Sequence, residues 1–349
     1  MHLPIPDFPP TTPSELNSAL YAAGSLQQGE VVGATITKRF QTTVSNLWFL
    51  EVEYDGSSSE LPHRLVVKWP LKRSPAPDQG IPEGTFYREL APIISSPPIV
   101  RCLAAASPTS KQQWLILEDL RSSHSNPPWP ECPGDDQVYE AVAVLARFHA
   151  SWWNSPGLGS TVGTFPSEKS LRSMVNDIAS HLPGLIDDLK EDLPVSDRSI
   201  LEAVFSSSLQ PWFRLLERRA LTVVHGDAHP WNFLFPRSGK GAPYLIDWQL
   251  WHLDVALRDV AFLLALHWEP TVRRRLEIPL LQHYHEELIK SGINDYSFDE
   301  LLLDYRRCVV RNLTFPIILW SRGLAREAFR NRLNYALAAY RDLDCAELL

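Results

Sequence analysis

Hydrophobic positions repeat differently along the two halves of the chain, and the difference predicts different secondary structure. Residues 33–54 alternate apolar and polar side chains on both sides of the polar segment QTTVSN, which predicts two antiparallel strands joined by a loop. The runs HRLVVKWP and WLILEDL predict two further strands. Ahead of them, Thr12, Pro13 and Glu15 supply a capping hydroxyl, a first-turn proline and a capping-box acid, so a helix should run from Pro13 to about Ala23.

The second half of the chain carries apolar residues at helical spacing. Residues 138–153, VYEAVAVLARFHASWW, have the period of a long buried helix. Residues 252–268, HLDVALRDVAFLLALHW, predict another helix that is buried on most faces, and several more helices are expected from residue 270 to the C-terminus. An antiparallel sheet with a helix, followed by a mostly helical part, makes the predicted fold class α+β.

Three polar side chains stand at the ends of short apolar strands in the middle of the sequence. LTVV at residues 221–224 is expected to be a buried strand, and HGDAHPWN is expected to be a loop because it contains glycine and proline. FLF and YLI should form strands on either side of the turn-forming segment PRSGKGAP. The polar residues that this arrangement presents are Asp227, Asn232 and Asp247.

These residue types are the ones that phosphoryl transfer requires. Such an enzyme orients the attacking hydroxyl with a carboxylate and holds metal ions against the phosphates. Asp227 suits the first task, and Asn232 and Asp247 suit the second as magnesium ligands. Asn232 follows Asp227 by five positions, the spacing of the protein-kinase catalytic loop. An HGD sequence alone also occurs where an aspartate caps a turn, so the phosphotransferase interpretation depends on all three residues together.

The sequence HGDxxxxN followed by IDW resembles the aminoglycoside phosphotransferase and choline kinase-like group, which is related in fold to the protein kinases. The resemblance implies a bilobal protein-kinase-like fold, with an antiparallel sheet in the N-terminal lobe and a mostly helical C-terminal lobe. It implies a nucleotide-binding lobe at residues 1–117, a hinge at 118–120 and a lobe with the catalytic loop and acceptor site at 121–349. The expected reaction moves the γ-phosphate of ATP, with Mg²⁺, to a hydroxyl of a small molecule.

Lys68 follows three apolar residues in the predicted third strand. A lysine buried there is unstable unless an anion pairs with it, whereas a lysine at a strand edge can extend its amine to solvent. The resemblance implies that Lys68 binds the ATP phosphates and that a glutamate on the next helix orients it. Glu83 is the expected partner, and Glu89 is its rival.

The loop between the first two strands contains no glycine, unlike the phosphate-binding loop usual in kinase-like folds. It is therefore either a phosphate loop that uses hydroxyls and backbone N–H groups or a plain hairpin turn. The candidate phosphate-binding residues are Thr42, Thr43, Ser45 and Asn46. The resemblance also implies that backbone groups of the hinge bind adenine, at Glu118 and Leu120.

Two further polar residues of the C-terminal part are expected to have structural roles. Asp259, in RDVAF, corresponds to the family's DLA position, so the resemblance implies that it accepts hydrogen bonds that brace the loop near His225. His149 is interpreted as a packed core residue rather than a catalyst.

Composition and charge narrow the function classes. The 33 basic and 41 acidic residues give a net charge of −8, so no general attraction for nucleic acid or an anionic membrane is expected. The four cysteines lie far apart without a CxxC pair, which argues against a zinc cluster or a disulfide framework. The N-terminus lacks a signal-peptide pattern, and no apolar run reaches about 18 residues. A soluble cytoplasmic protein is expected.

Two alternative functions and the acceptor stay open. A zinc hydrolase would use His225, Asp227 and His229, with His252 nearby, but it would leave Lys68 without a role. A pseudokinase would bind nucleotide without turnover. The acceptor is expected to be a small hydroxylated molecule. The 12 basic and 11 acidic residues from residue 270 onward weigh against a polycationic aminoglycoside. Trp231, Trp248 and Trp251 either present aromatic faces to an apolar or quaternary-ammonium acceptor or pack in the core.

Overall fold

The computed structural model describes residues 8–56, 60–71, 81–206 and 220–349 and forms two compact units. The first unit comprises Met1–Ser125 and Leu234–Trp251, and the second comprises Asn126–Phe233 and His252–Leu349. The segment after the predicted catalytic loop thus returns to the first unit instead of staying with the C-terminal part. The predicted hinge at residues 118–120 lies shortly before the first chain crossing, and its role as a hinge stays a prediction.

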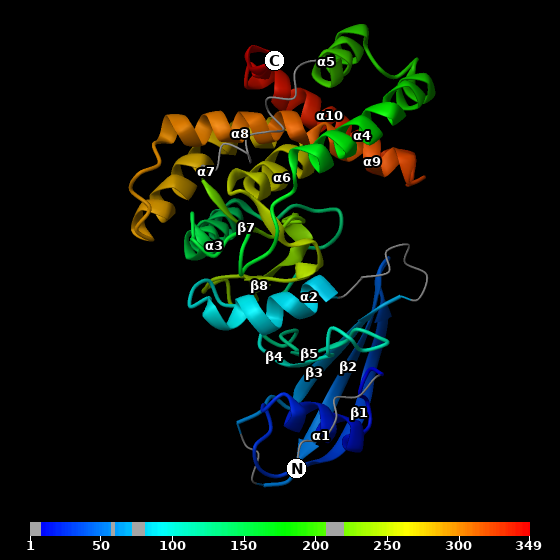
Figure 1. Cartoon of the computed structure of the whole chain (residues 1–349), viewed down its shortest axis with the longest axis vertical. Helices are drawn as coiled ribbons and strands as arrows, with labels where there is room; N and C mark the ends of the chain where they lie inside the picture. The colour runs from blue at the N-terminus through cyan, green and yellow to red at the C-terminus, as the bar shows by residue number, and fades with distance from the viewer. Residues whose placement is uncertain (1–7, 57–59, 72–80, 207–219) are drawn as a thin grey trace. The chain divides into compact units, whose positions relative to one another are not determined.

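The first unit is built on a five-stranded antiparallel sheet in the order β1-β2-β3-β5-β4 (Figure 1). A second, three-stranded sheet has the order β6-β8-β9. The strands are β1 (Val31–Gln41), β2 (Ser45–Tyr54), β3 (Arg64–Pro70), β4 (Cys102–Ala105), β5 (Leu115–Glu118), β6 (His124–Ser125), β8 (Phe233–Pro236) and β9 (Tyr244–Leu245). The helical segments are α1 (Pro13–Ala22), α2 (Ile81–Thr85), the π-helix η1 (Phe86–Leu90), and the 3₁₀ turns η2 (Ala91–Ile93) and η5 (Trp248–Leu250).

Alternation along β2 and β3 creates the core of the first unit. Leu50, Val52, Leu65 and Val67 point to one face, where they pack with residues of α1 in a single apolar cluster. Figure 1 shows α1, in dark blue, lying against this sheet. The strand faces follow the predicted pattern, and the opposite face carries Lys68.

The first helix forms where its capping signals predicted it. The Glu15 N–H donates to Thr12 Oγ1 over 3.4 Å, and the Thr12 N–H donates to the Glu15 carboxylate over 2.9 Å. This reciprocal capping box satisfies backbone donors that the first helical turn leaves without partners. The helix ends at Ala22, and the next residue, Ala23, caps its carboxyl end.

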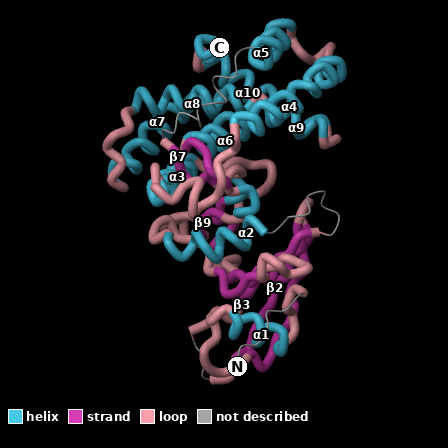
Figure 2. The backbone as a smooth tube through the Cα atoms, viewed as in Figure 1, coloured by secondary structure: helices cyan, strands magenta, loops and turns pink. Residues whose placement is uncertain are grey.

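The second unit is mostly helical, as Figure 2 shows in cyan, with one two-stranded sheet of β7 (Leu221–Val224) and β10 (His252–Val255). No helix in the described segments is long and apolar enough to cross a membrane. The helices are α3 (Asp135–Trp152), α4 (Glu168–Leu189), α5 (Val195–Ser206), α6 (Leu257–His267), α7 (Pro270–Lys290), α8 (Phe298–Asn312), α9 (Thr314–Ser321) and α10 (Arg326–Asp342), with 3₁₀ turns η4 (Pro230–Asn232) and η6 (Cys345–Leu348).

The prediction of one helix over residues 252–268 was wrong at its start. The first four residues form β10, which pairs antiparallel with β7, and helix α6 begins only at Leu257. In this register Leu253 lies opposite Val223, and Val255 lies opposite Leu221. A run as short as HLDV has no periodicity that separates helix from strand. The partner strand, distant in sequence, decides its conformation.

Candidate active site

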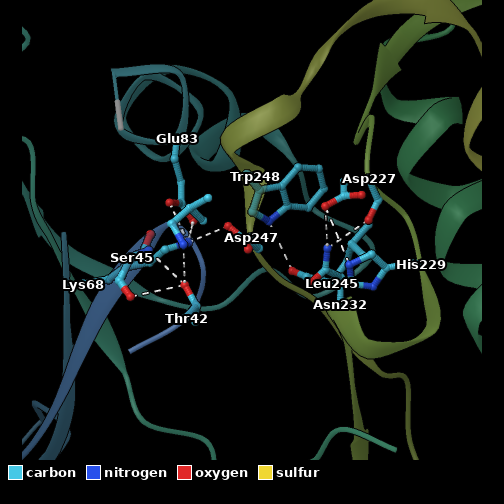
Figure 3. A network of polar contacts seen from close by, with 11 residues as sticks. Thr42, Ser45, Lys68, Glu83, Asp227, His229, Asn232, Leu245, Asp247 and Trp248 are labelled. Carbon is cyan, nitrogen blue, oxygen red and sulfur yellow. Dashed lines mark hydrogen bonds and ion pairs between the residues drawn. The ribbon is translucent and has the colours of Figure 1, made fainter. Parts of the chain in front are cut away.

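A buried ionic cluster in the first unit centres on Lys68 of β3 (Figure 3). Its Nζ donates to Glu83 Oε1 over 2.9 Å and to Asp247 Oδ1 over 2.6 Å, and only 10% of the Lys68 side chain is exposed. The predicted pairing with Glu83 is confirmed, whereas Glu89 is exposed. Burial of the amine also rules out a lysine that reaches to solvent.

The cluster holds two carboxylates around one ammonium group. Burial by itself would lower the pKa of Lys68, but the carboxylates of Asp247 and Glu83 outweigh burial and raise the pKa above its usual value. Burial raises the pKa of Glu83, and the Lys68 ammonium opposes that rise. With all three groups ionised the cluster has a net charge of −1, which favours a further cation near the carboxylates.

Aromatic packing fixes the distance between the two carboxylates. The Phe86 ring stacks on Trp248 with centroids 3.8 Å apart and an interplanar angle of 7°. The Trp251 indole N–H donates to the Pro82 carbonyl over 2.7 Å. These contacts tie the Glu83 helix to the segment that carries Asp247. Since Trp248 is fully buried here, it is a core residue rather than an acceptor-binding face.

Asp247 itself has a backbone conformation that is uncommon outside glycine. Its φ of 70° and ψ of 59° lie in the left-handed region, directly before the 3₁₀ turn η5. Non-glycine residues in this region cost free energy and are concentrated at functional sites. Aspartate tolerates the region better than most residues, so the chain can turn sharply here while presenting a carboxylate to Lys68.

The loop between β1 and β2 forms a tight hairpin turn. Thr42 Oγ1 accepts the backbone N–H of Val44 over 3.2 Å and that of Ser45 over 2.9 Å, and the Thr42 N–H donates to the Ser45 carbonyl over 2.8 Å. A threonine hydroxyl therefore satisfies N–H groups that a glycine-rich loop would direct at phosphate. Thr43 is exposed, whereas Ser45 and Asn46 already belong to β2.

The predicted hinge has one free backbone donor. The Glu118 N–H donates to the Arg101 carbonyl over 2.9 Å, and the Leu120 carbonyl accepts from His124 over 2.8 Å. The Leu120 N–H has no hydrogen-bond acceptor within the described segments. Next to it, the Arg121 guanidinium is held by the Asp119 carboxylate over 2.8 Å.

Arg121 is a residue at this end of the sheet that the sequence did not single out. Its guanidinium carbon lies 3.6 Å from the centroid of the Phe49 ring on β2, within the range of a cation–π contact. An open hollow of about 430 Å³ is lined by Arg121, Asp119 and residues of the three neighbouring strands. The only available signal was an arginine two positions after a strand-terminal acid, which is too common to be informative.

The predicted catalytic loop lies in the second unit, directly after β7 (Figure 3). Asn232 Nδ2 donates to the Asp227 backbone carbonyl over 2.9 Å, and it lies 3.5 Å from Asp227 Oδ2. The Asp227 N–H donates to His225 Nδ1 over 3.2 Å, so this ring nitrogen carries no proton. The spacing of five residues thus folds the two side chains onto each other, with 21% of the Asp227 side chain exposed.

Asp259 of α6 supports this loop by accepting hydrogen bonds from its backbone. Its Oδ2 accepts the His225 N–H over 2.6 Å, and its Oδ1 accepts the Gly226 N–H over 2.9 Å. His149 Nε2 lies 3.1 Å from the same carboxylate, and its Nδ1 lies 2.7 Å from the Tyr284 hydroxyl. Both predictions are confirmed, because Asp259 accepts the His225 N–H of the loop and His149 is a fully buried core residue.

A zinc site at the HGDAH segment is not formed. Within residues 8–56, 60–71, 81–206 and 220–349, no three side chains of His, Cys, Asp or Glu converge as metal ligands. His225 uses a ring nitrogen for the Asp227 N–H, and His229 Nε2 lies 3.6 Å from Asp227 Oδ2. The geometry therefore does not support the zinc hydrolase interpretation.

Comparison with known proteins agrees with this chemistry. The model of the phosphotransferase enzyme family matches residues 45–297, which include Lys68 and the complete catalytic loop. The chain belongs to the phosphotransferase enzyme family. Among proteins with curated descriptions, no sequence matches this family member.

Solved structures share the fold of this phosphotransferase-family chain at low sequence identity. A Ralstonia eutropha protein proposed to be an aminoglycoside phosphotransferase has a TM-score of 0.58 and 14% identity, covering 94% of this chain and 97% of its own. A choline kinase from Cryptosporidium parvum has a TM-score of 0.57 and 13% identity, covering 90% and 91%. The ADP-bound aminoglycoside phosphotransferase APH(2'')-Ib has a TM-score of 0.51 and 13% identity, covering 90% and 94%. The kinase-like fold class predicted from the sequence is therefore confirmed.

Proposed function

We propose that the chain is an ATP- and Mg²⁺-dependent phosphotransferase that moves the γ-phosphate to a hydroxyl of a small molecule. The observation that carries the proposal is the buried Lys68, held between Glu83 and Asp247. A buried lysine with two carboxylates is an unusual arrangement for stability alone, because removing charges from water costs several kcal/mol per ion. Binding of a phosphate anion and a metal cation explains why both signs of charge are present.

In this proposal each member of the cluster has a separate role. Lys68 binds the α- and β-phosphates, and Glu83 keeps its amine in position. Asp247 and Asn232 would hold Mg²⁺ through their side-chain oxygens. The metal would supply positive charge that neutralises the phosphates during transfer.

Asp227 acts on the acceptor. Its carboxylate orients the acceptor hydroxyl and takes up its proton as the oxygen attacks the γ-phosphorus. Hydrogen bonds from the braced backbone at His225 and Gly226 keep the loop rigid, which supports this positioning role. Partial exposure of the carboxylate leaves it accessible to a substrate.

Backbone groups of the predicted hinge bind the adenine base. The Leu120 N–H, which has no acceptor in the described part of the chain, donates to a ring nitrogen. The Glu118 carbonyl accepts from the exocyclic amine. Thr43 and Ser45 contribute hydroxyls near the phosphates, after the hairpin turn adjusts.

Isothermal titration with MgATP tests the Lys68 cluster through a matched pair of variants. Glu83→Gln removes the charge that orients Lys68 and should weaken MgATP binding roughly tenfold or more, because hydrogen bonds to charged groups contribute about 1.5–3 kcal/mol. Glu89→Gln changes the exposed acid six residues later and should leave the affinity unchanged. Equal affinities for both variants would refute the role of Glu83.

Turnover tests Asp227 independently. Asp227→Ala should keep its fold and its MgATP affinity while the rate of acceptor-dependent ADP release drops by roughly 10²- to 10⁴-fold. A variant that still phosphorylates the acceptor at the original rate would rule out Asp227 as the catalytic carboxylate.

A second candidate, a nucleotide-binding protein without turnover, is favoured by the Thr42 turn. The hydroxyl of Thr42 already occupies the N–H groups of Val44 and Ser45. If the turn keeps these bonds, fewer donors reach the phosphates. MgATP binding without ADP release against a broad panel of alcohols, sugars and aminoglycosides would support this candidate over the phosphotransferase.

A further inference from the structure

Aromatic rings of the catalytic loop form a cluster with two rings from other segments of the second unit. Trp231, one residue before Asn232, lies 4.2 Å from Trp129, measured between ring centroids, and 5.6 Å from His229. The His267 ring, at the end of α6, lies 5.7 Å from His229 and 5.9 Å from Trp231. His229 in turn lies 3.6 Å from the Asp227 carboxylate. We call Trp129, His229, Trp231 and His267 the aromatic cluster.

The cluster is bordered by a guanidinium group that no acid neutralises. Arg332 of α10 lies with its guanidinium carbon 5.7 Å from the centroid of the Trp129 ring, within reach of a cation–π contact. In the described part of the chain no carboxylate pairs with Arg332, and the groups that act on its charge are Tyr335 and Cys132. Three other arginines of this helix pair with aspartates. Arg326 contacts Asp188 and Asp192, Arg330 contacts Asp192, and Arg341 contacts Asp197.

Burial makes the lack of a partner unusual. Arg332 is half-buried, and burial lowers its pKa. Burial also lowers the pKa of His267 well below its usual value, and the charges of His229 and Arg332 lower it further. Glu269, an acid that acts on neighbouring Tyr335, caps the first turn of α7 through the Thr271 N–H over 3.0 Å. The aromatic cluster therefore has the Arg332 guanidinium beside Trp129 and the Asp227 carboxylate beside His229.

The loop that carries Trp129 is attached to the catalytic loop. Asn126 Nδ2 donates to the Trp231 carbonyl over 2.6 Å, and Cys132 Sγ donates to the His267 carbonyl over 3.3 Å. The buried indole N–H of Trp231 has no hydrogen-bond acceptor in the segments that the structure describes. Two-thirds of Trp129, by contrast, is exposed. The cluster thus combines an exposed aromatic face, a neighbouring cation and a buried indole N–H without a partner among the described residues, and its His229 lies beside the catalytic carboxylate.

We propose that the phosphate acceptor is an anionic molecule with a flat apolar part, in which Arg332 binds a carboxylate-type anion and Trp129 and Trp231 pack against the flat part. This inference rests on the proposed phosphotransferase activity and names its substrate class. The hydroxyl of the acceptor reaches Asp227, its oxygen bonds to the γ-phosphorus, and the bond from that phosphorus to the β-phosphate oxygen breaks. The hydroxyl proton passes to Asp227, and ADP leaves.

The same features disfavour cationic acceptors. A quaternary ammonium or aminoglycoside group would gain from the indole faces, but Arg332 already lies over Trp129 and repels a second cation. A planar guanidinium matches a carboxylate through two parallel hydrogen bonds. An anion therefore receives a charge partner here that a cation does not.

Three probes of the same shape and different charge test the proposal. Para-hydroxymethylbenzoate, para-hydroxymethylbenzamide and para-hydroxymethylbenzylamine share the ring and the hydroxyl, and each is titrated calorimetrically into the intact protein without nucleotide. The benzoate should bind at least tenfold more tightly than the amide or the amine. Equal or tighter binding of the amine, or no binding of the benzoate at millimolar concentration, overturns the proposal.

Variants of α10 separate the charge of Arg332 from its packing. Arg332→Gln should weaken benzoate binding roughly tenfold to hundredfold, and Arg332→Lys should restore part of it. Arg330→Gln, which loses only the exposed pair with Asp192, should bind like the original protein. The assignment is overturned if Arg332→Gln binds para-hydroxymethylbenzoate as tightly as the original protein does. It is also overturned if Arg332→Lys and Arg330→Gln weaken that binding by the same factor.

A separate MgATP titration on the same preparation distinguishes the two proposals. Charge-selective benzoate binding together with absent nucleotide binding would refute the phosphotransferase reaction but retain the anion site. Nucleotide binding and turnover with a cationic acceptor would retain the reaction and refute the anion site.

Discussion

Replacing Asp259 with asparagine should weaken the fold and the catalytic loop together. The Asp259 carboxylate is fully buried and accepts hydrogen bonds from the His225 N–H over 2.6 Å and the Gly226 N–H over 2.9 Å. His149 Nε2 lies 3.1 Å from Asp259 Oδ2. Asparagine keeps one acceptor oxygen and turns the other position into a donor. At least one of the two backbone N–H groups then faces an N–H₂ group instead of an acceptor.

The size of the effect follows from these contacts. A hydrogen bond to a charged group contributes about 1.5–3 kcal/mol, and an unsatisfied buried donor costs about 1–3 kcal/mol. Together they predict a loss of roughly 3–5 kcal/mol in the free energy of unfolding, or a drop in Tm of about 10 °C for a unit of this size. Turnover should fall as well, because the backbone next to Asp227 loses its support.

The effect should depend on pH in a defined direction. Burial alone would raise the pKa of Asp259, but the hydrogen bond and charge of His149 and the contacts at His225 hold it below its usual value. A lowered pKa in the folded state means that this carboxylate stabilises the fold above its unfolded pKa, about 4, and that the stabilisation is lost as pH falls below it. The difference between the original protein and Asp259→Asn should therefore shrink on acidification from pH 7 towards pH 3.

Thermal unfolding followed by circular dichroism at several pH values measures this difference. Asp295→Asn, at an exposed acid between α7 and α8, is the matched control and should unfold within about 1 °C of the original protein, as surface substitutions usually do. If Asp259→Asn unfolds like this control at pH 7, or if its deficit grows as pH falls, the bracing argument is wrong.

Three further substitutions test ion pairing and packing inside the two units. Lys68→Met leaves buried Glu83 and partly buried Asp247 without their cation, so the pKa values of these carboxylates rise. The variant should be less stable at pH 7 and should recover stability as the carboxylates protonate, which urea unfolding at pH 7 and pH 5 measures. Asp254→Asn breaks the buried pair with Arg311, whose atoms lie 2.6 Å apart, and should cost roughly 3–5 kcal/mol in urea unfolding. Phe86→Ala removes the ring stacked on Trp248 and should cost about 3–5 kcal/mol, with a change in tryptophan emission.

Each of these expectations can fail in a specific way. A Lys68→Met protein that loses stability on acidification would show that the lysine does not neutralise the carboxylates. An Asp254→Asn protein within about 1 kcal/mol of the original would mean that water solvates the arginine once the pair is broken. Unchanged emission in Phe86→Ala would mean that the indole of Trp248 keeps its environment without the stack.

Local sequence was enough to predict the parts of this protein that depend on short-range contacts. The capping box at Thr12 and Glu15 forms within one helical turn. The five-residue spacing from Asp227 to Asn232 brings the asparagine amide to the aspartate because the loop between them turns at a proline. Such features need only a few neighbouring residues, so they are visible in the pattern of residue types.

The tertiary structure decided the features that join distant segments. Tertiary packing selected Glu83 over Glu89, because Glu83 of α2 is buried against Lys68 whereas Glu89 of the following π-helix η1 is exposed. Pairing with β7 made HLDV a strand instead of the start of a helix. A contact between residues 129 and 332 brought a guanidinium to an indole, and neither residue belongs to a recognisable motif. Side-chain burial and charge pairing across long sequence separations cannot be read from residue types, because they depend on which surfaces the folded chain brings together.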